Sequence, residues 1–430
     1  MTAPVGPTEA TPGLVDAPAR TGGRRSALGG WRRVAAIALG LLVLLSIVRL
    51  VSGADELTSS GTSGAALRLA VPIGLAALGG LWAERAGVVN IGLEGMLILG
   101  TWFGAYVGFE VSPWAGVVAG ILAGAIGGLL HAIATVTFGV DHVVSGVAIN
   151  LLGAGVAQYL SQVAYADGQV PGAGPTQSAV VKPIAEVSLP VLSSGPDLLG
   201  RLDDAGIFLL SDAAGLLGGL TRGVSLLTIL AVLLVPLSFF VLWRTAFGLR
   251  LRSVGENPVA ADSLGVPVYR LKYTAVVASG AFAGLGGAAL VIGSIYREGQ
   301  TAGRGFIGLA AVIFGNWRPG GLAAGAGLFG YADALQLRAG NAVRGLLLLV
   351  ALLLVVVAVV QLVRRRLPMV VAALVMAAAF ALWYAAVDTV PSQLVGFTPH
   401  IVTLVVLAVA SQRLRPPAAD GQPYRRGQQS

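Results

Sequence analysis

Residues 345–363 read Gly-Leu-Leu-Leu-Leu-Val-Ala-Leu-Leu-Leu-Val-Val-Val-Ala-Val-Val-Gln-Leu-Val, and Arg364, Arg365 and Arg366 follow at once. A helix needs roughly 20 apolar residues to cross the hydrocarbon core of a bilayer. This stretch supplies them without a charged side chain. Arginines directly after such a helix favour the cytoplasmic side of the membrane. The stretch therefore predicts a membrane-spanning helix whose C-terminal end faces the cytoplasm.

The composition of the whole chain agrees with this class. Of the 430 residues, 56% are hydrophobic and 11% are charged, whereas about 25% of residues are charged in an average soluble domain. The absence of cysteine excludes disulfides and cysteine metal sites. The formal charge of +8 comes from basic residues placed where helices meet the cytoplasm, so we expect contact with membrane lipid and no binding of nucleic acid.

Apolar runs of spanning length recur along the chain. They cover residues 34–51, 65–82, 91–109, 113–137, 143–163, 223–243, 272–293, 320–337, 345–363, 368–387 and 397–411. The sequence thus predicts an all-α, polytopic membrane protein of about 10–12 transmembrane segments. Residues 1–33 are polar and arginine-containing, and predict a disordered cytoplasmic tail. Residues 34–51 also fit a secretory signal, but the many later spans favour a retained first helix.

The distribution of charge predicts an orientation and a half-length helix. If the N-terminal tail is cytoplasmic, residues 164–222 lie outside, where acids outnumber bases, and residues 244–271 lie inside, where bases gather. The C-terminal tail, 413–430, is then also cytoplasmic. These assignments hold only if the segment 306–337 enters and leaves on one side. The short run 306–316 is therefore expected to be a re-entrant half-helix that turns at 316–321 and pairs with 320–337.

Glycines spaced four residues apart mark helix faces that pack closely. Gly116, Gly120, Gly124 and Gly128 form one such stripe, and Gly280 with Gly284 begins another. Small residues at this spacing let helix backbones approach each other. We expect these stripes to serve packing within the subunit rather than a dimer seam.

The sequence does not predict catalysis. The three histidines, His131, His142 and His400, fall on separate segments without metal-ligand spacing, and no phosphate-binding loop of the Gly-x-x-x-x-Gly-Lys-Ser/Thr type is present. We therefore expect no metal, no cofactor and no ATP hydrolysis in this chain.

Polar residues interrupt the apolar runs in three places, where they are costly unless functional. Residues 82–95 carry Glu84, Arg85, Asn90 and Glu94 among three glycines, and Glu84 with Arg85 also fits an ordinary pair at the membrane interface. Residues 141–150 carry Ser145 and Asn150, which fit either helix–helix contact or a solute. Residues 305–317, the half-helix, end in Phe314 and Asn316. Paired broken segments are the usual pointer to a transport site, and the resemblance to a known family described below implies that Asn90, Glu94, Ser145, Asn150, Phe314 and Asn316 lie along the pathway.

A fourth motif lies in the basic loop 244–271. Asn257 is a helix cap, Pro258 fits the first helical turn, and Gly265 follows the end, so residues 257–264 predict a short helix. A plain linker is the alternative, but a linker needs no caps. A short capped helix in a cytoplasmic loop is typical of a docking element, which we assign to Gly255, Glu256, Asn257, Pro258, Ala260 and Ala261.

These motifs resemble the permease subunits of bacterial ABC importers of the ribose and branched-chain amino-acid superfamily. Residues 84–95, 141–150 and 255–261, and the C-terminal stretch 416–424, resemble its nucleoside (guanosine-type) uptake branch. The resemblance implies a bacterial inner-membrane permease with a second, related permease subunit, an extracytoplasmic substrate-binding lipoprotein and an ABC ATPase. The ATPase would carry the ATP and Mg²⁺ and would dock on 257–264 as a coupling helix. One departure is an insertion of two helices, 341–390.

The predicted function is one half of the permeation path for a small neutral solute, working by alternating access. Nucleosides are the first expectation, because asparagine amides pair with hydroxyls and base edges. A sugar or branched-chain amino-acid permease subunit is the nearest alternative. A stand-alone secondary transporter is a second alternative, and an intramembrane enzyme lacks a cluster of acid, base or metal ligands.

Overall fold

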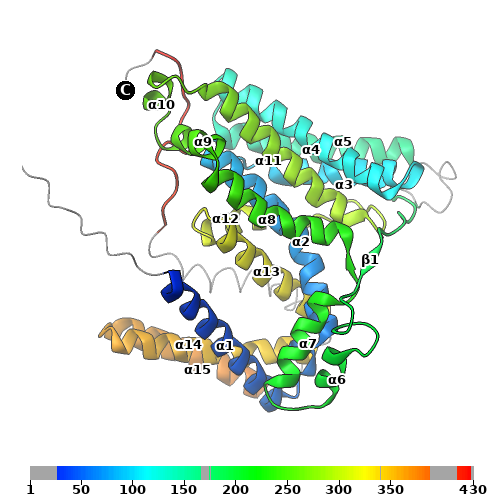
Figure 1. The fold of residues 1–430 in the computed structure, drawn as a ribbon, viewed down its shortest axis with the longest axis vertical. Helices are drawn as coiled ribbons and strands as arrows, with labels where there is room; N and C mark the ends of the chain where they lie inside the picture. Colours follow the sequence, from blue (N-terminus) through cyan, green and yellow to red (C-terminus); the bar gives the residue numbers. More distant parts are fainter. Residues whose placement is uncertain (1–26, 166–173, 175, 339, 388–413, 428–430) are drawn as a thin grey trace, which may run out of the picture.

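The structure is a computed structural model that describes residues 27–165, 174, 176–338, 340–387 and 414–427 (Figure 1). The predicted span 397–411, most of the predicted tail 1–33 and part of the loop 164–222 lie outside these residues. The first half contains α1 (Ala27–Ser52), the 3₁₀ turn η1 (Asp55–Leu57), α2 (Ser60–Arg85), α3 (Leu93–Glu110), α4 (Pro113–Ala132), the π-helical turn η2 (Ile133–Thr137) and α5 (His142–Ala164).

Two short strands and three helices follow in the middle of the chain: β1 (Glu186–Val187), α6 (Leu198–Asp204), α7 (Leu210–Thr221), β2 (Val224–Ser225) and α8 (Leu226–Arg244). The remaining helices are α9 (Ala246–Glu256), α10 (Pro258–Ser263), α11 (Val268–Val291), α12 (Arg304–Phe314), α13 (Pro319–Gln336), α14 (Gly340–Val363) and α15 (Leu367–Ala386). β1 and β2 pair antiparallel. Eight of the described helices are long and apolar enough to cross a membrane, so the all-α polytopic prediction is confirmed.

Glycine contacts hold the centre of the bundle together. A Cβ placed on Gly124 of α4 would lie 2.2 Å from the carbonyl oxygen of Gly280 in α11, and one placed on Gly284 would lie 2.1 Å from that of Gly120. Gly100 of α3 meets the backbone of Gly284 in the same way, so three helices approach one another at this glycine. Side chains larger than hydrogen have no room there. The predicted stripes therefore pack helices within this chain.

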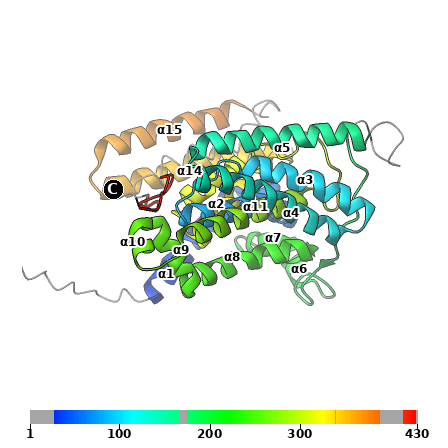
Figure 2. The ribbon, with the colours of Figure 1, turned by 90° about the horizontal axis from the view of Figure 1, so that it is seen from above.

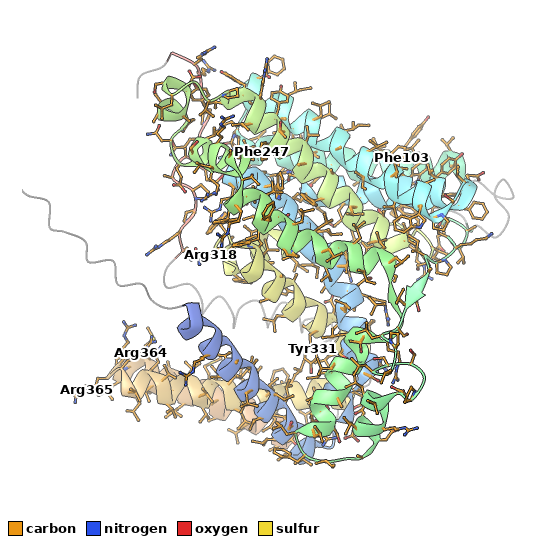
Figure 3. All side chains as sticks on the ribbon, viewed as in Figure 1. Phe103, Phe247, Arg318, Tyr331, Arg364 and Arg365 are labelled. Carbon is orange, nitrogen blue, oxygen red and sulfur yellow. The ribbon has the colours of Figure 1, made fainter. Side chains whose placement is uncertain are left out.

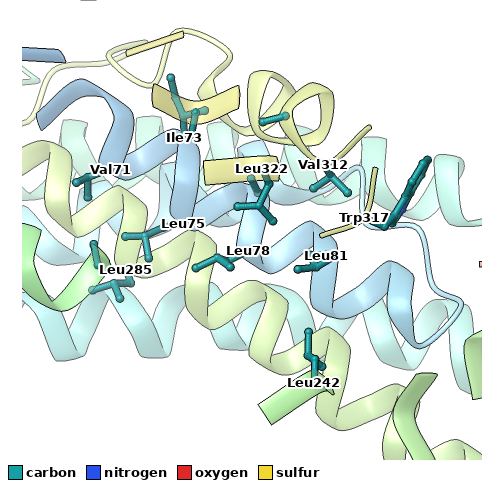
Figure 4. Packing of buried hydrophobic residues seen from close by; sticks show 14 of the residues in the cluster. Val71, Ile73, Leu75, Leu78, Leu81, Leu242, Leu285, Val312, Trp317 and Leu322 are labelled. Carbon is teal, nitrogen blue, oxygen red and sulfur yellow. The ribbon is translucent and has the colours of Figure 1, made fainter. Parts of the chain in front are cut away.

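Around α2 the core is made of branched and aromatic side chains. Figure 4 shows Leu75, Leu78 and Leu81 of α2 surrounded by residues from five other segments of the chain. These neighbours include Leu242 of α8, Leu285 of α11, Val312 of α12, Trp317 of the turn and Leu322 of α13. Helix α2 is thus the central element, and 67% of the residues in its most apolar stretch are buried.

The half-helix has the predicted form. Helix α12 covers only Arg304–Phe314, a turn follows, and α13 returns along α2. Gly315 and Gly321 let the two arms approach at the turn, because a Cβ on Gly315 would lie 2.3 Å from the amide nitrogen of Leu322. The tip of this re-entrant pair lies near α9 and the end of α2 (Figure 1).

Three features differ from the sequence-based expectation. Helix α1 begins at Ala27 and not at residue 34, because a helix can continue past the point where its apolar run meets the membrane surface. The loop 164–222 contains the helices α6 and α7, and α7 packs on the start of α2 where Gly219 meets Ser60. The loop 244–271 contains α9 in addition to the predicted short helix.

The helices α1, α14 and α15 form a separate peripheral group. Helix α14 packs on α1, and α15 packs on α14, below the bundle in the view of Figure 1; Figure 2 shows α5 along one side of the bundle. In α15 only 11% of the spanning residues are buried, and in α14 17%. Figure 3 shows Arg318, Arg364 and Arg365 on the left side of the molecule in that view.

Candidate functional site

The first part of the site is a break between α2 and α3 inside the bundle. Helix α2 ends in a Schellman motif, in which the amide of Gly87 donates to the carbonyl of Glu84 and the amide of Val88 to that of Ala83. Gly87 has the positive φ of 76° that this motif requires. The chain then returns toward the bundle centre, since Asn90 lies beside Ser279, at the midpoint of α11.

Polar side chains satisfy the backbone groups of this break. The ammonium of Lys272 donates to the carbonyl of Gly87 at 3.2 Å. The amide of Val89 donates to Nδ1 of His142 at 3.2 Å, and the carbonyl of Val89 lies 3.1 Å from Nε2 of His131. Non-helical backbone at membrane depth is tolerated only where such partners exist. These three basic side chains therefore make the break possible.

Asn150 and Ser145 of α5 belong to the same network. The amide group of Asn150 accepts from the backbone nitrogen of Gly95 at 2.7 Å and donates to the carbonyl of Ile91 at 3.0 Å. The hydroxyl of Ser145 lies 2.8 Å from Nδ1 of His131. Asn150 thus ties α5 to the end of the break where α3 begins. The structure places both residues in helix contact, and their contact with a solute stays a prediction.

Asn90 is completely buried in the centre of the break. Its Nδ2 donates to the hydroxyl of Ser279 at 2.9 Å. Its Oδ1 has no hydrogen-bond partner among the residues that the structure describes. A buried polar atom without a partner is uncommon and calls for an explanation, such as a ligand or a water molecule.

Glu94 joins the two broken segments directly. It lies in the first turn of α3, and its carboxylate accepts from the backbone nitrogens of Gly303 and Gly305 at 3.0 and 2.6 Å. These nitrogens belong to the start of α12. A carboxylate is stabilised at a helix N-terminus by the free N–H groups and the helix dipole. Glu94 lies at the N-termini of both α3 and α12, so its one buried carboxylate joins the two helices.

The other end of the half-helix is fixed to the end of α2. Helix α12 also ends in a Schellman motif, with Asn316 at φ 50° in the position after the helix. The guanidinium of Arg85 donates to the carbonyl of Trp317 at 2.6 Å, and the indole N–H of Trp317 donates to the carboxylate of Glu84. Glu84 and Arg85 therefore hold the tip of the re-entrant pair. Both contact Trp317, whereas the alternative of an ordinary pair at the membrane interface predicted no such contact.

The last two predicted pathway residues lie at this tip. The ring of Phe314 stacks on that of Phe329 in α13, with 5.8 Å between centroids, and Oδ1 of Asn316 accepts from the backbone nitrogen of Arg415 at 2.8 Å. The structure thus brings Asn90, Glu94, Ser145 and Asn150 together near the bundle centre. It places Phe314 and Asn316 at the far end of the half-helix.

The second part of the site is the loop with α9 and α10. Asn257 caps α10, since its Oδ1 accepts from the backbone nitrogen of Ala260 at 2.9 Å, and Pro258 is the first helical residue. Gly255 packs on the end of α2, where a Cβ would lie 2.3 Å from the carbonyl oxygen of Arg85. Glu256 lies 3.8 Å from the guanidinium of Arg85. The predicted short helix is therefore present, and the end of α9 that precedes it packs on the end of α2.

One face of α10 is anchored and another is open. Ala261 is buried against Val254, Val268 and Leu271. Val259 and Leu264, in contrast, expose 42% and 84% of their surface. Apolar side chains that face solvent beside a basic loop fit a protein contact.

Sequence reasoning missed several members of the site. Lys272, Ser279, His131 and His142 were not assigned to a site. A common signal was available, because each is a polar residue inside or next to an apolar run. The partner of Glu94 could not be inferred, since Gly303 and Gly305 are far along the chain.

Comparison with known proteins identifies relatives over most of the chain. NupQ, a guanosine ABC transporter permease of Bacillus subtilis, is 37% identical over 282 residues, which cover 64% of this chain and 81% of NupQ. NupC, a nucleoside ABC transporter permease of Lactococcus lactis, is 31% identical over 362 residues, covering 82% and 93%. TsgB13, a glucose ABC transporter permease of Haloferax volcanii, is 27% identical over 275 residues, covering 61% and 65%.

A family model assigns the same class. Residues 64–359 match the model for the permease component of branched-chain amino acid transport systems. The match includes both broken segments and the α9–α10 loop. No solved structure matches the chain. By this match and these relatives, the chain belongs to the branched-chain amino acid transport permease family and is a membrane-spanning permease subunit of an ABC transporter.

Proposed function

We propose that this subunit imports nucleosides across a bacterial inner membrane. The observation that carries the proposal is the similarity to two permeases named for guanosine and for nucleosides, at 37% and 31% identity. The chemistry of the break is compatible with it, because amide and hydroxyl groups such as those of Asn90 and Ser279 can pair with ribose hydroxyls and base edges.

The proposed transporter contains further subunits. An ABC ATPase, which holds ATP and Mg²⁺ and carries out hydrolysis, docks on α10. A second permease subunit completes the path, and an extracytoplasmic lipoprotein delivers the solute to the outer loops within 164–222. The exposed Val259 and Leu264 support the ATPase contact. Both chain termini lie in the cytoplasm in this arrangement, as the basic residues near α10 and Arg364–Arg366 favour.

The pathway is proposed to pass the junction where α3 and α12 meet. Oδ1 of Asn90, without a partner among the described residues, is available for a solute. Glu94 sets the position of the half-helix beside it. Closure of the ATPase would move α10, and contact between Gly255 and the end of α2 would pass the movement to the break.

Uptake of radiolabelled solutes tests the solute class. Cells that produce the complete transporter are expected to accumulate guanosine or uridine, and cells with this gene deleted are not. Asn90→Ala should lower uptake without lowering the amount of protein in the membrane. The matched control is Asn341→Ala, in the predicted two-helix insertion. Unchanged uptake in the Asn90 variant would remove that residue from the pathway.

Glucose import is the second candidate, since TsgB13 is named for glucose. Excess unlabelled glucose would then compete with uptake, and unlabelled nucleosides would not. Deletion of the ATPase gene separates both candidates from a secondary transporter. Uptake that persists without the ATPase would overturn the proposed ATP-driven mechanism.

A further inference from the structure

The C-terminal segment Leu414–Gly427 contacts three regions that are distant in the chain. It begins at the tip of the re-entrant pair, where the amide of Arg415 donates to Oδ1 of Asn316 at 2.8 Å. It then passes α9, where the amide of Ala419 donates to the carbonyl of Gly255 at 2.9 Å. These are backbone contacts of the segment, so they fix its path and not only its side chains.

The middle of the segment is inserted into the end of the bundle. Ala419 is 6% exposed, and its carbonyl oxygen would lie 3.1 Å from a Cβ on Gly87, in the Schellman turn of α2. Asp420 follows, half-buried and close enough to Lys272 for their charges to interact. Burial raises the pKa of Asp420 to about 7, and the nearby ammonium of Lys272 acts in the opposite direction. The segment therefore seals the inner end of the break.

The end of the segment runs alongside α10. The ring of Tyr424 lies 5.6 Å from that of Tyr269, and the guanidinium of Arg426 lies 3.3 Å from the carboxylate of Asp262 in α10. Between α10 and the segment is a cavity of about 490 Å³. Its walls include Asn257, Pro258 and Val259 on one side and Gln422, Pro423 and Tyr424 on the other.

We propose that the C-terminal segment Leu414–Gly427 is the second half of the ATPase-docking surface, and that a loop of the ATPase inserts into the cavity between this segment and α10. The inference rests on the proposed ATPase partner. We assign the cavity to the ATPase because the cavity is continuous with the proposed docking helix. It begins at the N-cap of α10 and adjoins Val259, whose side chain is exposed. The segment also holds α10 to the re-entrant tip, so that movement of the ATPase reaches both broken helices.

Filling the cavity tests the proposal without removing the contacts that hold the segment. Gln422 lines the cavity and is exposed. The variant Gln422→Trp, purified with the complete transporter, is expected to retain about tenfold less ATPase on the tagged permease. The matched control Gln177→Trp changes an exposed glutamine in the loop 164–222 and should retain as much ATPase as the unmodified chain. Full retention of the ATPase by Gln422→Trp would overturn the proposal.

A variant of α10 separates this inference from the proposed function. Leu264→Asp should also reduce the retained ATPase, because it places a charge on the exposed apolar face of α10. If Leu264→Asp retains less ATPase and Gln422→Trp does not, the C-terminal segment is no part of the interface while α10 remains a docking site. If neither variant changes retention, the proposed docking on α10 fails as well.

Cross-linking tests whether the segment stays in place. The chain has no cysteine, so Tyr269→Cys with Tyr424→Cys gives a single reactive pair. A short bis-maleimide is expected to link the pair equally in membranes with and without ATP. A link that forms only without ATP would show that the segment leaves α10 during the cycle and would overturn its role as a fixed wall.

Discussion

The central helices and the peripheral group differ in how much of their surface is buried inside the protein. In α2 and α11, 67% and 61% of the spanning residues are buried, against 11% in both α1 and α15. The peripheral helices are nonetheless at least as apolar by sequence. In lipid, apolar side chains gain little by leaving the surface, and helices associate through small residues and polar contacts instead. Among the described helices, the peripheral α14 is thus the most hydrophobic, whereas α2 and α11 at the candidate site are less hydrophobic than α1, α14 and α15.

The strongest test of this contrast is a matched pair of glycines. Gly284→Leu places a side chain where even a Cβ would lie 2.1 Å from the carbonyl of Gly120, so α4 and α11 must separate. We expect almost complete loss of folded protein, measured as monodisperse material extracted from membranes. Gly40→Leu in α1, where no atom lies within 4 Å of the added Cβ, should leave the yield unchanged. Equal yields would contradict the packing described here.

The junction of the two broken helices should show the next largest effect. Glu94→Ala removes the acceptor for two backbone nitrogens of α12, and loss of one capping acceptor costs about 0.5–2 kcal/mol. We expect solute uptake to fall more than tenfold, whereas Glu94→Gln, which keeps one oxygen, should retain an intermediate rate. Glu110→Gln, at the exposed end of the same helix, is the control and should transport normally.

The two lysines of the chain offer a further comparison. Lys272→Met leaves the carbonyl of Gly87 without its donor, and an unsatisfied buried acceptor costs about 1–3 kcal/mol. The apparent Tm of the purified protein should fall by several degrees, and uptake should decrease with it. Lys182 is exposed, so Lys182→Met should melt like the unmodified chain. A normal Tm for Lys272→Met would mean that water donates a hydrogen bond to the carbonyl of Gly87 in place of Lys272.

The smallest effect is expected where the centre meets the periphery. The hydroxyl of Tyr331 in α13 donates to the carbonyl of Leu57, 2.5 Å away, in the turn that follows α1. Tyr331→Phe should cost about 1 kcal/mol, seen as a small decrease in Tm with uptake unchanged. Tyr159→Phe, on the exposed side of α5, is the control. A large loss of uptake would show that the peripheral group takes part in transport.

Sequence patterns predicted the elements far better than their contacts. The apolar runs marked the spans because lipid demands a minimum length, and the charge rule required the half-helix that became α12. Both ends of α10 could be predicted because Asn257 and Gly265 determine the backbone of residues next to them in the sequence. Helices α6 and α7 were missed because their short, mixed sequences carry no spanning signal.

The candidate site was predictable in outline only. Asn90, Glu94 and Asn150 were identified because polar residues in apolar runs are costly. Their partners were not predictable, since the contact of Glu94 with Gly303 joins residues more than 200 positions apart. The same holds for the C-terminal segment, whose backbone contact with Gly255 has no counterpart in local sequence pattern.

The glycine seam between α4 and α11 limits how this subunit can move. Atoms of the two main chains meet there with no side chains between them, so no rotamer change can absorb a shift of one helix against the other. The pair must rotate or translate as one rigid body. The points where the molecule can bend are then the two Schellman turns at Gly87 and Asn316, where non-helical backbone joins consecutive helices.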